Sequence, residues 1–255
     1  MIVGIAGSGN IAAAMARGWA HGEGGPERML FTDSGSGRAS SLADEVGGEA
    51  LDSNQELAER ADLLVLAVKP SALGAVAAEA QKAPAVLSLL GATSLASVAD
   101  AFPSASALRA MPNIGVELRR GVLIFTASQN SPEALLTEVR ESLQLLGRVV
   151  ELDDKLFDAA TAVMGCAPAY LALVMEAIAE AGASDGLESD LSHSLIVDAA
   201  AGTAEVLRHH HPDALREAVA SPGGSTEAGL AVLEDEDVAE AFEEAVRASL
   251  ARMRE

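Results

Sequence analysis

The chain has 255 residues and carries 38 acidic against 17 basic side chains, a formal net charge of −21 at pH 7. Such a charge excludes nucleic acid and anionic membranes as partners, because both repel an acidic surface. No apolar run approaches the roughly 20 residues that a membrane-spanning helix needs. The N-terminus lacks the basic leader of a signal peptide, so we expect a cytoplasmic protein that binds no membrane.

The first half of the chain alternates short apolar runs with helical patterns, which predicts βαβ units and a mostly parallel sheet. Leu63–Val68 is continuously apolar, as expected of a central strand that is buried on both faces. Strands are expected at Met1–Ala6, Met29–Thr32, Leu63–Val68, Ala85–Leu89, Ala107–Ala110 and Val122–Thr126. Helices are expected at Asn10–Ala20, Gly37–Val46, Ser53–Ala58 and Ser71–Ala80, and a further helix starts near Pro132.

From Lys155 onward the pattern is helical, with no convincing strand. Ala169–Gly182 is almost wholly apolar, which predicts a buried helix, and apolar stripes within Leu191–Val206 and Val238–Val246 predict two more. We therefore expect an α/β fold with an N-terminal Rossmann-like dinucleotide-binding domain at residues 1–152. An all-helical domain at residues 153–255 follows. Because this part is small and apolar, we expect it to dimerise with a second copy of itself, and the glycine turn within it, described below, makes it the expected substrate-binding part.

A glycine turn directly follows the first predicted strand and opens a helix. It has the sequence Gly7-Ser8-Gly9-Asn10-Ile11-Ala12, a G-x-G-x-x-A pattern. In such a turn Gly7 permits the tight bend, Gly9 lets the backbone approach a pyrophosphate, and Ala12 lets the helix pack closely on the sheet. The pyrophosphate lies on free N–H groups at the positive end of the helix. The context predicts dinucleotide binding.

Two further segments follow predicted strands at the edge where ligands bind in such sheets. Asp33 stands where an acid binds a ribose 2′-hydroxyl, which favours NADH, but Ser34, Ser36 and Arg38 are a set that holds a 2′-phosphate. The sequence therefore leaves NADPH and NADH open. Lys69 precedes Pro70 after another strand, where it either contacts the cofactor or is a solvated strand end.

Another glycine turn leads into a helix near the C-terminus. Its sequence is Ser221-Pro222-Gly223-Gly224-Ser225-Thr226-Glu227-Ala228. Its unpaired backbone N–H groups and two hydroxyls suit a small carboxylate. The alternative is a capping sequence in which Ser225 or Thr226 is the N-cap.

These residues together resemble the pyrroline-5-carboxylate reductase family over essentially the whole chain. The resemblance is carried by Gly7–Ala12, Leu66–Pro70, Arg109–Asn113, Ala167–Tyr170 and Ser221–Leu230. The last segment is close to the family's signature and is fairly specific, whereas the others occur more loosely among dinucleotide-binding reductases.

The resemblance implies that hydride passes from NADPH or NADH to the imine carbon of 1-pyrroline-5-carboxylate, giving proline. It also implies a homodimer, or a larger homo-oligomer, formed through the C-terminal helices. The substrate carboxylate is expected at Ser221, Gly223, Gly224, Ser225 and Thr226, with the Thr226 hydroxyl as the catalytic group on the ring nitrogen. The loop Arg109–Asn113 is expected beside the nicotinamide. The expected cofactor-binding residues are Gly7, Ser8, Gly9, Asn10, Ile11, Asp33, Ser34, Arg38, Ala67, Val68, Lys69, Pro70, Met111 and Asn113.

Several positions depart from the family pattern, which leaves the exact substrate open. They are Ile114, Gly115, Met164, Cys166, His209 and Ala218. We interpret Cys166 as a small packing residue, since no histidine accompanies it in sequence, and its being the only cysteine excludes an intrachain disulfide. His209, His210 and His211 point in different directions if helical, so we expect no metal site there.

Two alternatives to this function remain. One is a related reductase that acts on another small cyclic imine or a keto acid. The other is a non-catalytic paralogue that binds a dinucleotide without turnover. The acidic composition also has two interpretations, an ordinary acidic surface or adaptation to high salt, where screening weakens charge repulsion.

Overall fold

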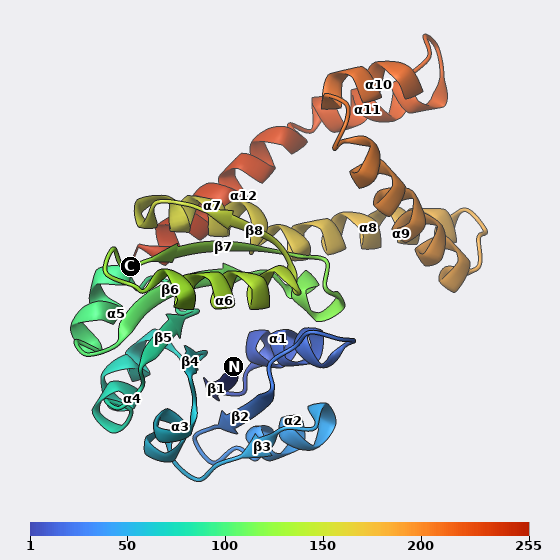
Figure 1. Cartoon of the computed structure of the whole chain (residues 1–255). Coiled ribbons are helices and arrows are strands. Elements are labelled where there is room, and N and C mark those ends of the chain that lie inside the picture. The colour runs from blue at the N-terminus through green and yellow to red at the C-terminus, as the bar shows by residue number, and fades with distance from the viewer. Residues whose placement is uncertain (255) are drawn as a thin grey trace. The chain divides into compact units, whose positions relative to one another are not determined.

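The computed structural model describes residues 1–254 and forms two compact units (Figure 1). The first unit contains Met1–Cys166 together with the last residues from Leu250, and it is built around a β-sheet. The second unit contains Ala167–Ser249 and is helical. The last strand of the sheet ends at Glu151, and the short helical turns up to Cys166 still belong to the first unit.

The sheet has eight strands in the order β3-β2-β1-β4-β5-β6-β7-β8. The strands are β1 (Ile2–Ala6), β2 (Arg28–Thr32), β3 (Glu49–Ala50), β4 (Leu63–Leu66), β5 (Ala85–Ser88), β6 (Ser106–Pro112), β7 (Gly121–Ala127) and β8 (Gly147–Glu151). Only the β6–β7 pair is antiparallel, which confirms the expected mostly parallel sheet. The chain runs outward from β1 to β3 and then returns to β4 on the other side of β1, so a crevice opens between the carboxyl ends of β1 and β4.

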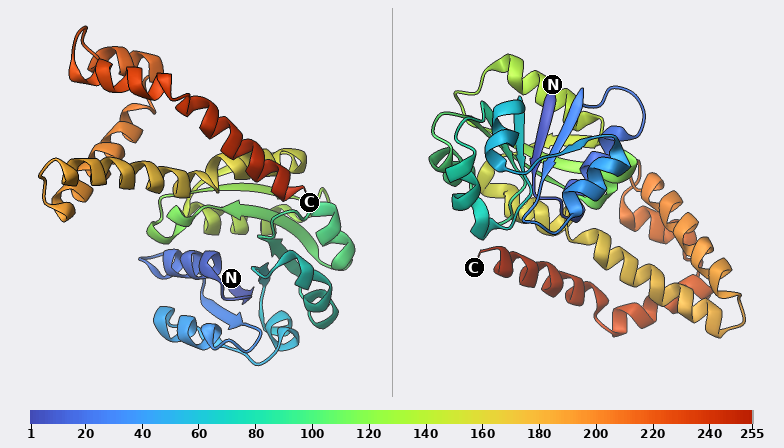
Figure 2. Two further views of the ribbon diagram at one scale, coloured as in Figure 1. Left: turned by 180° about the vertical axis from the view of Figure 1, so that it is seen from behind. Right: turned by 90° about the horizontal axis from the view of Figure 1, so that it is seen from below.

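Helices cover both faces of the sheet (Figure 1, Figure 2). One face packs against α1 (Asn10–Ala20), α2 (Arg38–Val46) and α6 (Glu133–Gln144). The other face packs against α3 (Asn54–Arg60), α4 (Leu73–Glu79) and α5 (Leu95–Ala101). Short helical segments complete the unit: η1 (Pro70–Ala72), η2 (Ile114–Leu118), η3 (Asp154–Leu156) and α7 (Phe157–Met164).

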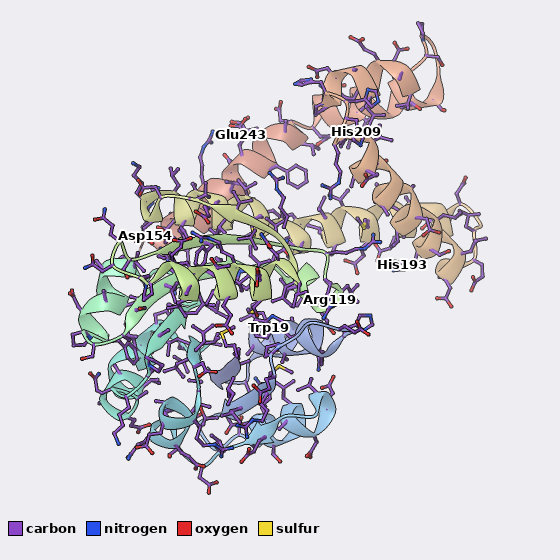
Figure 3. All side chains as sticks on the ribbon, viewed as in Figure 1. Trp19, Arg119, Asp154, His193, His209 and Glu243 are labelled. Carbon is purple, nitrogen blue, oxygen red and sulfur yellow. The ribbon has the colours of Figure 1, made fainter. Side chains whose placement is uncertain are left out.

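Helix α1 is held to the first unit at its carboxyl end, which keeps its amino end in place at the glycine turn. Trp19 is 1% exposed, and its Nε1 donates to the Ser142 carbonyl at 2.9 Å. The Arg119 Nε donates to the Gly18 carbonyl at 2.7 Å and so satisfies one of the free carbonyls that end a helix. Figure 3 labels Trp19 and Arg119 at this end of α1.

Among the elements that were not predicted, two strands and one helix of the first unit each have a weak sequence pattern. Strand β3 has two exposed residues at the edge of the sheet, too few to show alternation. Strand β8 forms the other edge and has no fully buried residue. Helix α5 buries only Val98 among its own residues, so its apolar stripe is short, although Ser94 caps it by accepting from the Ser97 N–H.

The second unit is made of helices: α8 (Ala167–Ser184), α9 (Ser189–Val206), α10 (Pro212–Val219), α11 (Ser225–Asp235) and α12 (Val238–Met253), the last of which runs into the first unit. The described chain has no strand after Glu151, as expected. Helices α8 and α9 form a close hairpin, in which the Ser192 hydroxyl donates to the Ala179 carbonyl at 2.8 Å. Tyr170 links α8 to α12 by a 2.6 Å hydrogen bond to the Ser249 hydroxyl.

The prediction that Ala169–Gly182 is buried is wrong for the single chain. Helix α8 buries only Ala179, whereas Leu171 and Leu173 are 55% and 64% exposed. A helix that is apolar around its circumference needs neighbours on all sides, and the second unit is too small to supply them.

The expectation of no membrane-length apolar run is also wrong. Within the described residues, Asp154–Ser184 is long and apolar enough by length and composition to cross a membrane. An 18-residue window of this segment has a mean hydropathy of 1.7, and 11% of that window is buried. A helix whose surface is covered by another protein chain has the same composition.

Candidate active site

The glycine turn after β1 uses its two glycines for different reasons. Gly7 has a φ of +95°, donates its N–H to the Thr32 carbonyl at 3.0 Å, and a Cβ there would stand 2.6 Å from the Ala67 carbonyl oxygen. Gly9 is the N-cap of α1, has an ordinary φ of −77°, and beyond its two chain neighbours no described atom lies within 4 Å of where its Cβ would be. The fold itself therefore requires glycine at position 7. At position 9 the open space suits a ligand that approaches the backbone.

Two cavities flank this turn at the carboxyl ends of β1 and β4. The first, of about 500 Å³, is lined by Gly7, Ser8, Gly9, Asp33, Ser34, Arg38, Ala67, Val68 and Lys69 among others. The second, of about 380 Å³, is lined by Ser8, Gly9, Asn10, Arg38 and Ile114 among others. Both are far larger than a water molecule, and they meet at the N-terminus of α1, where the first N–H groups have no helical partner. The crevice at the switch point of the sheet is where a dinucleotide fits.

Four predicted cofactor residues do not line these cavities. Ile11 packs against the core, Pro70 begins η1, and Met111 lies on β6 opposite Ile124 of β7. Asn113 is the N-cap of η2; its Nδ2 donates to the Met164 carbonyl at 3.2 Å and its Oδ1 accepts from the Val122 N–H at 3.1 Å. Asn113 therefore connects the end of β6 to the end of α7.

Asp33 organises its own loop. One carboxylate oxygen accepts from the N–H groups of Gly35 and Ser36 at 2.7 and 3.0 Å. The other accepts from the Ser36 hydroxyl at 2.8 Å and from the Ala39 N–H at 2.9 Å. These bonds, that from Ala39 foremost, lower the pKa of Asp33 to about 2. A carboxylate has about four acceptor positions, so all of them are in use within the loop.

Two cations beside the first cavity have no ion-pair partner in the described part of the chain. Arg38 begins α2 and Lys69 follows β4, and both side chains are exposed. A chain with a net charge of −21 offers many carboxylates, yet these two cations stay unpaired. Free cations at the mouth of a cavity favour an anionic ligand such as a phosphate.

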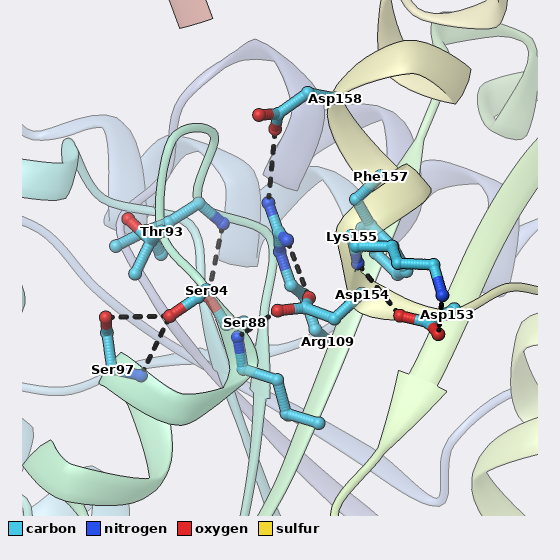
Figure 4. Close-up of polar contacts among 12 residues, drawn as sticks. Ser88, Thr93, Ser94, Ser97, Arg109, Asp153, Asp154, Lys155, Phe157 and Asp158 are labelled. Carbon is cyan, nitrogen blue, oxygen red and sulfur yellow. Dashed lines mark hydrogen bonds and ion pairs between the residues drawn. The ribbon is translucent and has the colours of Figure 1, made fainter. Parts of the chain in front are cut away.

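Arg109 is not at the surface of the cofactor crevice but inside the first unit (Figure 4). Its side chain is 4% exposed, its Nη1 lies 2.7 Å from Asp154 Oδ1, and its guanidinium stacks 4.5 Å from the centre of the Phe157 ring. The other oxygen of Asp154 accepts from the Leu95 N–H at 2.9 Å. Sequence analysis missed this cluster, since Asp154 lies 45 residues from Arg109. The ion pair ties β6 to η3 and to the start of α5.

The predicted substrate residues lie together, in the loop that follows α10 and in the first turn of α11. Gly223 has a φ of +73°, and the Gly224 N–H donates to the Ser221 carbonyl at 2.9 Å. The N-cap of α11 is Gly224, so the alternative in which Ser225 or Thr226 caps the helix is wrong. Within the described chain, the N–H groups of Ser225 and Thr226 and the Thr226 hydroxyl have no protein partner. The loop thus presents free donors to an anion.

One residue of this loop was not predicted. Glu227, the third residue of α11, accepts the Gly223 N–H through its Oε2 at 2.7 Å. In a capping box a glutamate three residues after the N-cap accepts the N-cap N–H, whereas Glu227 accepts the N–H of the residue before the N-cap.

Cys166 and the histidine run have no special surroundings. Cys166 is half-buried just after α7, and its N–H donates to the Thr161 carbonyl at 3.2 Å. His209 to His211 are exposed between α9 and α10, and His211 is the N-cap of α10 (Figure 3 labels His209). The described residues contain no group of three or more His, Cys, Asp or Glu that could hold a metal ion.

Comparison with known proteins finds a family model for each half of the chain and relatives of one family over nearly its whole length. Residues 154–255 match the model "Pyrroline-5-carboxylate reductase dimerisation", and residues 2–91 match "NADP oxidoreductase coenzyme F420-dependent". The pyrroline-5-carboxylate reductase of Synechocystis is 35% identical over 99% of this chain and 97% of its own length. That of Thermus thermophilus is 37% identical over 82% of this chain and 87% of its own. The NADP-bound structure of the Plasmodium falciparum pyrroline carboxylate reductase superposes with a TM-score of 0.91 at 25% identity, covering 100% of this chain and 97% of the other.

Proposed function

Because the chain belongs to the pyrroline-5-carboxylate reductase family, we propose that it reduces 1-pyrroline-5-carboxylate to proline with hydride from NADPH or NADH. It is an oxidoreductase of proline biosynthesis. The observation that carries this function is the pairing, in one chain, of an open dinucleotide turn at Gly9 with free anion-binding donors at the start of α11.

We propose that the first unit holds the dinucleotide. The cavities fit it because Gly9 leaves its Cβ position empty and the N-terminus of α1 offers unpaired N–H groups to a pyrophosphate. When bound, the nicotinamide supplies the hydride that adds to the imine carbon. Asn113 keeps the end of β6 fixed against the end of α7, and Lys69 places a positive charge beside the first cavity.

We propose that NADPH is preferred over NADH. All four acceptor positions of the Asp33 carboxylate accept hydrogen bonds from its own loop, so binding of a ribose 2′-hydroxyl would break bonds that hold the loop. Arg38 and Ser34 line the same cavity, and Arg38 has no other partner within residues 1–254. A free guanidinium is suited to a 2′-phosphate.

We propose that the second unit binds the substrate carboxylate on the free N–H groups of Ser225 and Thr226. The Thr226 hydroxyl then bonds the ring nitrogen. A protonated imine is already a strong hydride acceptor, so the protein need supply only position and charge, and positioning alone is worth about 7–11 kcal/mol. This agrees with the absence, in the described loop around Thr226, of a paired acid and base.

The helices of the second unit support a homodimer or a larger homo-oligomer, and we propose that it works in the cytoplasm as a proline-biosynthesis enzyme. Apolar side chains on α8, α9 and α11 are exposed in the single chain, among them Leu173 at 64%, Leu195 at 52% and Val232 at 60%. Because residues 154–255 match a dimerisation model, a second copy of the chain is the partner that would cover these faces.

Ile114, which departs from the family pattern, favours the alternative in which the substrate is another cyclic imine or a keto acid. Ile114 is 49% exposed and lines the second cavity, where an apolar group suits a different imine or keto acid. The test is oxidation of NADPH and NADH with 1-pyrroline-5-carboxylate, in dilute buffer and in molar salt, with other cyclic imines and keto acids in parallel. We expect turnover with 1-pyrroline-5-carboxylate to exceed that with every other compound. Faster turnover with another imine would move the assignment to that substrate, and cofactor binding with no turnover would favour the non-catalytic alternative.

A further inference from the structure

We propose that Glu227 weakens substrate binding, because its carboxylate already occupies the anion-binding end of α11. The inference rests on the proposed function, in which the substrate carboxylate binds at this same helix end. It makes Glu227 a residue that sets the substrate affinity of this particular enzyme without touching the reacting atoms.

The hydrogen bonds of the loop leave few donors for a substrate. Gly223 gives its N–H to Glu227 at 2.7 Å, and Gly224 gives its N–H to the Ser221 carbonyl at 2.9 Å. Glycine at position 223 takes a φ of +73°, in the left-handed region that a side chain disfavours. The donors that remain are the N–H groups of the first turn of α11, beginning at Ser225. A substrate carboxylate must therefore bind beside the carboxylate of Glu227 or displace it from Gly223.

The charge of Glu227 is not compensated by a side chain. In the part of the chain that the structure describes, Glu227 has no ion-pair partner, and its only hydrogen bond is to the backbone of Gly223. The positive end of one helix amounts to about half an elementary charge, which does not neutralise two carboxylates. Two unit charges some 4–6 Å apart near water repel enough to change a binding constant by a factor of about 3 to 10.

This repulsion depends on salt in a defined way. The Debye length falls to about 3 Å at 1 M salt, so dissolved ions screen the repulsion between the two carboxylates there. The KM of the wild-type enzyme for 1-pyrroline-5-carboxylate should therefore fall as salt rises, toward the value of an enzyme without the Glu227 charge.

The test compares Glu227→Gln with Glu234→Gln. Glutamine at 227 keeps an acceptor for Gly223 and loses the charge. Glu234 is exposed on the same helix, about 10 Å further along the axis, so its replacement removes the same charge at a distance. We expect the KM of Glu227→Gln for 1-pyrroline-5-carboxylate to fall by a factor of about 3 to 10 in dilute buffer. We expect an unchanged KM for NADPH, a wild-type KM in Glu234→Gln, and a difference that closes in molar salt.

Three results would overturn the proposal. A KM in Glu227→Gln equal to or above that of the wild type would leave Glu227 as a helix cap only. An equal fall in both variants would assign the effect to net charge. A difference that persists in molar salt would exclude charge repulsion as the cause. Wild-type enzyme that binds NADPH but never turns over 1-pyrroline-5-carboxylate is a distinct result, because it refutes the proposed function itself and this inference with it.

Discussion

Replacing Gly9 by valine should abolish NADPH binding while leaving the fold intact. Gly9 has an extended backbone that valine adopts, and beyond its chain neighbours no described atom lies within 4 Å of its Cβ position, so we expect the melting temperature to change by no more than about 2 °C. The valine side chain fills the space through which a pyrophosphate reaches the N-terminus of α1. Losing two charge-assisted hydrogen bonds at about 1.5–3 kcal/mol each weakens NADPH binding at least about 100-fold.

Replacing Gly7 by alanine should instead destabilise the fold. The Gly7 φ of +95° costs about 1–2 kcal/mol for a residue with a side chain, and a Cβ placed 2.6 Å from the Ala67 carbonyl oxygen adds about 1–3 kcal/mol of overlap. At about 2–4 °C per kcal/mol, the melting temperature should fall by roughly 5–15 °C.

Calorimetric titration with NADPH and thermal melts measure both effects. Gly74→Val is the matched control for the valine, since Gly74 lies on α4 and also has no described atom within 4 Å of its Cβ position. Gly74→Val should bind NADPH as the wild type does. If Gly9→Val bound NADPH within about threefold of the wild type, the turn would not be the cofactor site.

The other predictions concern specificity, the reaction and stability. Arg38→Ala should raise the KM for NADPH about tenfold and leave that for NADH unchanged; equal changes for both cofactors would remove Arg38 from 2′-phosphate recognition. Thr226→Ala should lower kcat about 10- to 100-fold with no change in NADPH affinity, whereas Thr226→Ser should retain most of the wild-type kcat. Unchanged turnover in the alanine variant would exclude the hydroxyl from the reaction. Asp154→Ala should destabilise the protein by about 2–4 kcal/mol in urea unfolding because it leaves buried Arg109 with only the more distant Asp158, 4.0 Å away, as an ion-pair partner. A loss below about 0.5 kcal/mol would mean that the pair does not hold η3 to β6.

The first unit could be predicted well where local pattern and fold agree. The turn at Gly7 and Gly9 could be recognised by its context, directly after a strand and opening a helix, and α1 begins and ends at the predicted residues, Asn10 and Ala20. The role of Asp33 could not be predicted, because sequence shows a carboxylate after a strand but not that its loop folds back to use every acceptor position.

Features that depend on distant parts of the chain, or on a second chain, were beyond local reasoning. Arg109 matches a family motif, yet its partner Asp154 comes to it only through the order of strands in the sheet. The apolar sequence of α8 predicts burial, but it does not show whether the same chain or a second chain buries the helix. Glu227 had a local signal, its position three residues after a glycine N-cap, and that signal was overlooked beside the hydroxyls of the same segment.

The central claim is that this chain transfers hydride to the imine carbon of 1-pyrroline-5-carboxylate. The most direct measurement is incubation of the wild-type enzyme with that imine and NADPH carrying deuterium on the reactive face of the nicotinamide, followed by mass spectrometry and NMR of the product. The account predicts proline with one deuterium on the ring carbon that was double-bonded to nitrogen. Oxidation of the cofactor without labelled proline, or no oxidation by enzyme that binds NADPH, would contradict it.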